Sequence, residues 1–111
     1  MANAYKILGQ SNLSAETLTS VYTVPSSTET VISTIIIANL DSSATTFRIA
    51  LRPDGASVSD AHYIAYDVPL AANDSTTLTL GITIDAADVV SAYAGASSNV
   101  TVSVFGTEIT A

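Results

Sequence analysis

Cysteine and tryptophan are absent from the sequence, and basic residues are scarce. Without cysteine, the chain can form neither a disulfide nor a thiolate metal site. Only Lys6, Arg48 and Arg52 are basic, against ten acidic residues, which gives a formal net charge of −7. Nucleic acids and anionic membranes are bound through clustered cations. We therefore expect the chain to bind neither.

Long hydrophobic runs are missing as well. The longest strongly apolar run, Ile35–Ala38, is far shorter than the roughly 20 residues that a membrane-spanning helix needs. The first residues, MANAYKILGQSNL, have no basic region followed by a long apolar stretch. Secretory signals combine those two features, so we expect a soluble product made in the cytoplasm.

The composition that remains suits a small folded domain. The 111 residues predict a single domain, 1–111, with a core that needs no covalent staples. Hydrophobic residues make up 48% of the chain and charged residues 12%, whereas disordered chains combine high charge with low hydrophobicity. Serine, threonine and alanine are abundant. These short side chains lose little entropy when a contact immobilises them, which favours packing into a larger assembly.

Apolar and polar or small residues alternate with a period of two along most of the chain, as Leu78, Leu80 and Ile82 do with Thr79 and Gly81. This alternation is typical of strands with one buried face. It predicts eight strands, at Tyr5–Gln10, Thr17–Val24, Glu29–Asn39, Thr45–Arg52, His62–Leu70, Thr76–Ile84, Val89–Ala94 and Val100–Ile109. Short strands and frequent turns indicate an all-β fold, an antiparallel β-sandwich of about eight strands. The period leaves open whether the topology is immunoglobulin-like or a jelly-roll.

Two of these segments raise the question of a partner. Glu29–Asn39 has five Val or Ile residues between positions 31 and 37. It is either an ordinary central strand or a strand whose second face, with Ile35 and Ile37, meets a neighbouring subunit. Residues 1–12, which include Tyr5, are either the first strand or an N-terminal arm that pairs with a neighbour.

The stretch from Arg52 to Leu70 is the most chemically varied part of the chain, and it contains the only histidine. His62 could act as a general base with Asp60 or Asp67, on a serine such as Ser57 or Ser59. No Gly-x-Ser-x-Gly motif accompanies these residues. We therefore expect no catalytic residue and no enzymatic activity, with His62 as a half-exposed residue at a strand end.

Metal and sugar binding are the remaining chemical alternatives. Aspartates gather near the expected turns, where they either ligate calcium or bond the backbone beside them. No calcium loop of the Asp-x-Asp-x-Asp-Gly type is present, so we expect no metal and no cofactor. Tyr63 and Tyr66, three residues apart in a strand, should point to opposite faces. An exposed aromatic cluster would suit a carbohydrate, although tryptophan is absent.

Tyrosine and arginine are common in protein interfaces. Together with the two strand arguments above, this favours an interface role for several of the chain's prominent side chains. The candidate interface residues are Tyr5, Ile35, Ile37, Arg52, His62, Tyr63 and Tyr66.

Three segments carry a resemblance to known proteins: YTVPSSTETVISTIIIANLDSSATTFRIALRPDG, HYIAYDVPLAANDSTTLTLGITIDAADVVSAYA and NVTVSVFGTEIT. They cover most of residues 21–110. Their signature is a Tyr-Thr-Val-Pro opening, a Thr-Phe-Arg strand that leads to an Arg-Pro turn, a His-Tyr strand and a closing Phe-Gly-x-Glu-Ile-Thr. The chain resembles small structural proteins of tailed-bacteriophage particles.

The resemblance implies a non-enzymatic virion component. We expect a decoration or cement protein on the head surface that binds the major capsid protein and stabilises the shell. We also expect a homo-oligomer, with a trimer as one form. The alternatives are a tail or neck accessory protein and a receptor-binding or glycan-binding module.

Overall fold

The computed structural model describes residues 2–95 and 99–110, and within them the fold is all-β. The strands are β1 (Ala2–Leu13), β2 (Thr19–Thr23), β3 (Thr28–Asn39), β4 (Thr45–Arg52), β5 (Tyr63–Leu70), β6 (Ser75–Ile84), β7 (Val89–Ala94) and β8 (Val100–Thr110). Two 3-10 turns, η1 (Pro53–Gly55) and η2 (Asp60–His62), lie between β4 and β5. Across the described ranges, no helix has the length and apolar character needed to cross a bilayer.

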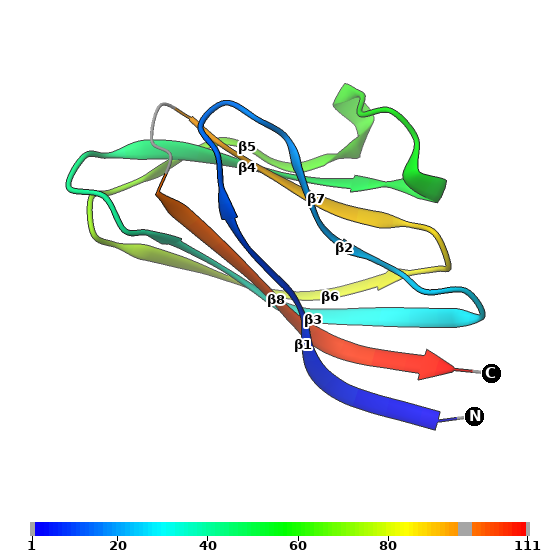
Figure 1. Cartoon of the computed structure of the whole chain (residues 1–111). Helices are drawn as coiled ribbons and strands as arrows, with labels where there is room; N and C mark the ends of the chain where they lie inside the picture. Colours follow the sequence, from blue (N-terminus) through cyan, green and yellow to red (C-terminus); the bar gives the residue numbers. More distant parts are fainter. Residues whose placement is uncertain (1, 96–98, 111) are drawn as a thin grey trace.

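The strands form two antiparallel four-stranded sheets that pack face to face, one in the order β1-β8-β3-β6 and the other β2-β7-β4-β5 (Figure 1). Each strand of the first half pairs with its counterpart in the second half: β1 with β8, β2 with β7, β3 with β6, and β4 with β5. Successive pairs therefore fall in alternate sheets, as when one long hairpin is rolled over itself. This is the jelly-roll topology. An immunoglobulin sandwich instead places its first two strands side by side in one sheet.

The expected antiparallel sandwich of about eight strands is confirmed, and most of its strand boundaries lie within a few residues of the predicted ones. The largest differences are in the first two strands. β1 runs over Ala2–Leu13 and pairs with β8 along its whole length, so residues 2–12 belong to the first strand. The chain ends lie side by side at one end of the molecule, where Ala2 is opposite Thr110 (Figure 1).

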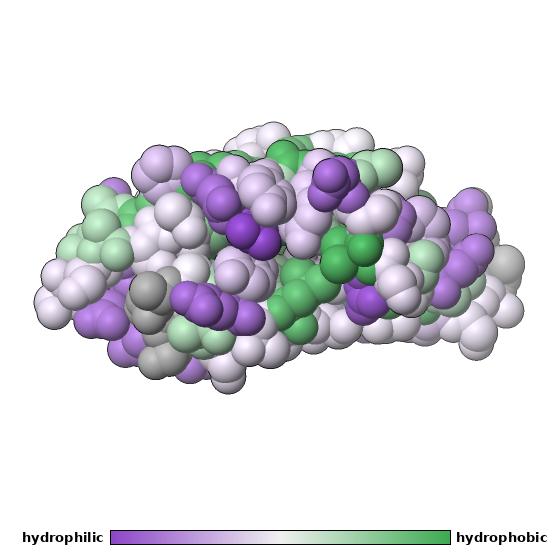
Figure 2. All heavy atoms as spheres, turned by 90° about the horizontal axis from the view of Figure 1, so that it is seen from above, coloured by the Kyte–Doolittle hydropathy of each residue, from purple (hydrophilic) through white to green (hydrophobic). Residues whose placement is uncertain are grey.

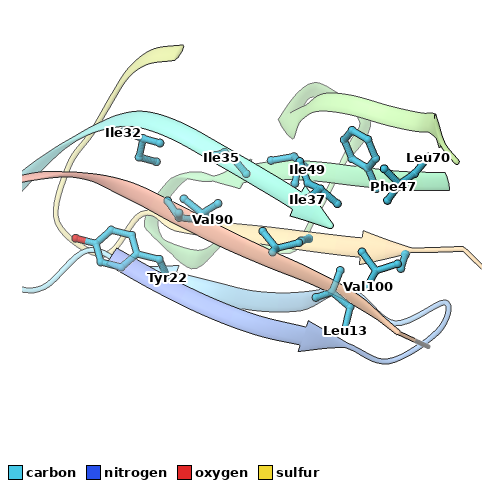
Figure 3. Packing of buried hydrophobic residues seen from close by; sticks show 14 of the residues in the cluster. Leu13, Tyr22, Ile32, Ile35, Ile37, Phe47, Ile49, Leu70, Val90 and Val100 are labelled. Atoms are coloured by element: carbon cyan, nitrogen blue, oxygen red, sulfur yellow. The ribbon is translucent and has the colours of Figure 1, made fainter. Parts of the chain in front are cut away.

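The core is a layer of branched aliphatic side chains between the sheets, and the molecule around it is elongated, 45 × 27 × 19 Å (Figure 2). Phe47 and Ile49 of β4 and Val90 of β7 face Ile35 and Ile37 of β3 across this layer (Figure 3). Burial of apolar surface of this kind supplies most of the favourable free energy of folding.

β3 corrects the expectation that Ile35 and Ile37 lie at an interface. A β-bulge between Ile32 and Thr34 shifts its register against β6 and β8. After the bulge, Ile35 and Ile37 point inward with 0% exposure. Their side chains are therefore in the chain's own core, where no partner can reach them.

The outward residues of β3, Val31 and Ile36, are half-buried. The central run of Val and Ile is thus divided between the two faces of one strand, and the outer face is covered only in part.

The same bulge creates a close approach between β3 and β8. A Cβ atom added to Gly106 would lie 2.1 Å from the carbonyl oxygen of Val31 and 3.0 Å from Cα of Ile32. Backbone cannot retreat from such a contact without moving the strand pair. By contrast, a Cβ atom added to Gly81 of β6 would have no neighbour within 4 Å.

We expect Gly106→Ala to lower the free energy of unfolding by about 1–3 kcal/mol or more, because the added methyl group overpacks the contact between β3 and β8. Urea denaturation of the purified variant measures this directly. Gly81→Ala is the matched control, and it should leave stability unchanged or raise it by up to about 1 kcal/mol. Equal effects of the two substitutions would contradict the steric account.

Candidate functional site

The outer face of the β2-β7-β4-β5 sheet carries a cluster of aromatic and charged side chains centred on Arg48. Its guanidinium carbon lies 4.1 Å from the ring centre of Tyr66 and 4.3 Å from that of Tyr93. Arg48 Nε donates to Asp67 Oδ1 at 2.6 Å, and Nη2 donates to Oδ2 at 3.3 Å. Asp67 thereby raises the pKa of Arg48 above its usual range. The pair fixes the cation between two rings, where cation–π attraction adds to the hydrogen bonds.

Tyr63 and Tyr66 lie on the same face, and the prediction that they point to opposite faces is wrong. Their rings meet edge to face, with centroids 4.9 Å apart and an interplanar angle of 83°. The strand is irregular here: its register against β4 shifts twice between Phe47 and Ala50. Asp67, next to Tyr66, has a positive φ of 52°. A bulge of this kind interrupts the alternation of side chains.

A groove of about 400 Å³ opens beside the two rings and is lined by Asp60, Tyr63 and Tyr66. The η2 turn places Asp60 there. His62 closes the turn through two hydrogen bonds with Ser59. Its ring Nδ1 accepts the backbone N–H of Ser59 at 3.1 Å, and its backbone N–H donates to the carbonyl of Ser59 at 3.0 Å. His62 is half-buried, as expected of a residue at a strand end, and its ring holds the loop in shape.

Arg52 lies on the same outer face, where its side chain binds other parts of the chain. Its guanidinium donates to Ser91 Oγ of β7 at 3.0 Å, to Ser20 Oγ of β2 at 3.0 Å and to the carbonyl of Ala56 at 3.2 Å. It therefore ties two strands to the loop that follows η1. Seen from this side, the surface has short hydrophobic streaks between polar groups rather than one continuous apolar area (Figure 2).

A second set of exposed apolar side chains lies on the opposite sheet. Tyr5 and Ile7 of β1 are opposite Thr107 and Phe105 of β8, and they are 80% and 54% exposed. Cross-strand partners point to the same face. Glu108, the neighbour of Thr107, points inward, so Tyr5 and Ile7 point outward. Tyr5 is thus separated from Tyr63 and Tyr66 by the full thickness of the sandwich.

A buried polar network closes the core at the end near the chain termini. The hydroxyl of Tyr22, which points away from the apolar side chains (Figure 3), donates to Glu108 Oε2 at 2.6 Å. Thr30 Oγ1 lies 2.8 Å from the same hydroxyl oxygen, and Lys6 Nζ lies 2.6 Å from Glu108 Oε1. Burial and the bond to Glu108 raise the pKa of Tyr22 to about 12. Lys6, with help from Tyr22, holds the pKa of Glu108 below its usual value.

This network is suited to holding strands together. A tyrosine with a raised pKa is a weak proton donor at neutral pH, and an ion-paired carboxylate with a lowered pKa is a weak base. Its members come from β1, β2, β3 and β8, so it joins both sheets at one end of the sandwich.

Four aspartates near turns, Asp41, Asp74, Asp85 and Asp88, accept hydrogen bonds from backbone N–H groups. Asp88 accepts the N–H groups of Asp54 and Asp85, at 2.9 and 2.8 Å, while Asp85 Oδ1 accepts that of Ala86 at 2.8 Å. Asp74 accepts the N–H of Ser75 in the same way. Within residues 2–95 and 99–110, no three His, Asp or Glu side chains are grouped so that they could hold a metal ion.

Of the candidate interface residues, Tyr63 and Tyr66 line one groove, and His62 closes the turn beside it. Arg52 lies on the same sheet face, and Tyr5 lies on the other sheet. The central residue of the cluster, Arg48, was not among the candidates, and neither was Tyr93. One sequence signal could have identified Arg48: it is a cation in a strand whose other residues are almost all apolar or small. Neither the protein-family models nor the curated protein sequences contain a match to this chain.

We expect the network at Glu108 to make stability fall in acid. The pKa of Glu108 is lowered in the folded state, so its contribution is present above the ordinary value of 4.5 and is lost as pH falls through the folded pKa. Melting temperatures measured from neutral pH downward should therefore fall more steeply below pH 4.5 for the wild type than for Glu108→Gln.

The exposed Glu29 of β3 provides the control. Glu29→Gln should follow the wild-type curve. If the wild-type and Glu108→Gln curves stay parallel through the acid range, the ion pair with Lys6 does not contribute as described.

Proposed function

We propose that this protein is a non-enzymatic structural component of a tailed-bacteriophage particle and that it decorates the head shell. The observation that carries the proposal is the presence of exposed apolar side chains on both outer faces of one rigid sandwich. Tyr5 and Ile7 lie on the β1-β8-β3-β6 sheet, and Tyr66, which is 54% exposed, lies on the other.

Two opposed contact surfaces suit a protein that bridges neighbours. A cement protein has to hold two shell subunits, or a shell subunit and another copy of itself, at a fixed separation. When one surface is bound, the other is presented at a high effective concentration, so modest contacts combine into strong attachment. The arrangement of each patch on paired strands keeps the distance between the two surfaces constant.

The rest of the surface supports the same role. Most outward positions of β6 are serine or threonine, as at Ser75, Thr77 and Thr79, and these side chains lose little entropy when a partner covers them. Jelly-rolls also build viral capsid domains, although lectins and cupins share the fold. The fold therefore supports the proposal only by analogy. The resemblance of the signature segments to phage structural proteins is the reason for proposing a phage particle as the assembly.

A receptor-binding or glycan-binding module is the second candidate function. The groove beside Tyr63 and Tyr66 favours it, since aromatic rings with a nearby carboxylate can contact a sugar. A tail or neck accessory protein would use the same two surfaces at a different place on the particle.

Cryo-electron microscopy of intact particles, with copy number from quantitative mass spectrometry, separates these alternatives. We expect density on the head lattice and a copy number that scales with the shell. A few copies confined to the neck or tail would contradict head decoration, and absence from purified particles would remove the virion role altogether.

Variants test whether both faces are needed. We expect the double variant Tyr5→Ser, Ile7→Ser and the single variant Tyr66→Ser each to bind undecorated heads about 100-fold more weakly or worse, because either loss removes bivalent attachment. Leu40→Ser is the control: Leu40 is 55% exposed, in the turn between β3 and β4, and its replacement should leave binding unchanged. Full binding by both patch variants would rule out the bridging role.

A further inference from the structure

We infer that the groove lined by Asp60, Tyr63 and Tyr66 binds a basic side chain, lysine or arginine, that projects from the surface of a partner protein. This inference deepens the proposed function by naming the chemistry of one partner surface, and it rests on that function only in taking the partner to be a protein.

The first argument is the chain's charge. All three of its basic side chains are engaged within the chain: Lys6 with Glu108, Arg48 with Asp67, and Arg52 with two serines and a carbonyl. The net charge is −7. A partner that docks on this chain therefore meets a surface of predominantly negative potential, and complementary association requires cations on the partner.

The second argument is the shape of the groove. The rings of Tyr63 and Tyr66 meet at 83°, so they form a corner. Asp60, which is exposed, supplies a carboxylate on the groove wall. A cation in such a corner meets aromatic surface and a negative charge together, the two features that attract an ammonium or guanidinium group. A pyranose ring would instead stack its C–H face on an aromatic ring, and Arg48 already covers one face of Tyr66, which leaves less ring surface for a sugar.

The third argument is that the groove is built in advance. Arg48, held by Asp67, braces the ring of Tyr66, while the η2 turn, closed by His62, fixes the position of Asp60. Little side-chain order remains to be gained on binding, which lowers the entropic cost of the contact. Beside the groove, the guanidinium of Arg48 already lies between the rings of Tyr66 and Tyr93, so cation–π stacking occurs within the chain itself.

Asp67 has a second consequence for the groove. Arg48 would repel a second cation near Tyr66 if its charge were uncompensated. The carboxylate of Asp67 contacts the guanidinium of Arg48 at 2.6 and 3.3 Å and offsets its positive charge. The repulsion between Arg48 and a cation bound in the groove is thereby reduced. Asp67 thus acts as a positioning residue for the groove without lining it.

The test is titration of the folded protein with short blocked peptides, followed by NMR of the tyrosine ring protons. The probes are acetyl-Gly-Lys-Gly-amide and acetyl-Gly-Arg-Gly-amide, with the norleucine analogue, which lacks the ammonium group, as a neutral control and methyl α-glucopyranoside as the sugar. We expect millimolar binding of the two basic peptides, with shifts of Tyr63 and Tyr66 that weaken as salt is raised. Norleucine and the glucoside should produce no shift.

Variants locate the site. Asp60→Asn and Tyr66→Leu should each weaken binding of the lysine peptide about five- to tenfold, and Asp67→Asn should weaken it about two- to threefold by exposing the charge of Arg48. Tyr5→Leu, on the other sheet, should bind as the wild type does. Asp60 is exposed, so its replacement tests the groove even if Tyr66→Leu fails to fold.

Two results would overturn the inference: shifts with the glucoside but not with the basic peptides, or no shift with any probe. Neither result bears on localisation to the particle, which is measured separately. Failure of the groove and failure of the proposed function are therefore distinguishable.

Discussion

The β-bulges determine which side chains this sandwich shows to its surroundings. The alternation of a strand assigns every second side chain to the core, and one inserted residue reverses the assignment for all that follow. In β3 the bulge after Ile32 turns Ile35 and Ile37 inward. In β5 the irregular register brings Tyr63 and Tyr66 to one face, and every property of the groove beside them depends on that shift.

Regular features of the fold could be predicted from the sequence, and irregular ones could not. Alternating Leu and Thr in Ser75–Ile84 define a strand regardless of its surroundings. Whether β1 and β2 share a sheet depends on contacts between residues far apart in the chain, so the jelly-roll could not be distinguished from an immunoglobulin-like sandwich. The bulges carry no marker such as glycine at their shifted positions in β5, and the expectation for Tyr63 and Tyr66 was wrong for that reason. Arg48 was missed because its role requires Tyr93, which is distant in sequence but adjacent in the sheet.

The signature segments quoted in the sequence analysis meet in pairs in the folded chain. Tyr22, from the Tyr-Thr-Val-Pro opening, bonds Glu108, from the closing Phe-Gly-x-Glu-Ile-Thr. Arg48, from Thr-Phe-Arg, stacks on Tyr66, which packs in turn on Tyr63 of the His-Tyr strand. These residues thus form one contact that joins the two sheets and one that shapes an outer face.

The adjacent chain ends have a mechanical consequence. Ala2 and Thr110 are paired at the same end of the antiparallel β1–β8 ribbon. Force that pulls the two ends apart would peel the ribbon, loading its hydrogen bonds one after another rather than all together. Force that crosses the sandwich from Tyr5 to Tyr66 would be spread over the whole core. The fold is therefore weak against traction on its ends and strong against load through its faces, which is the direction that the proposed bridging role would load.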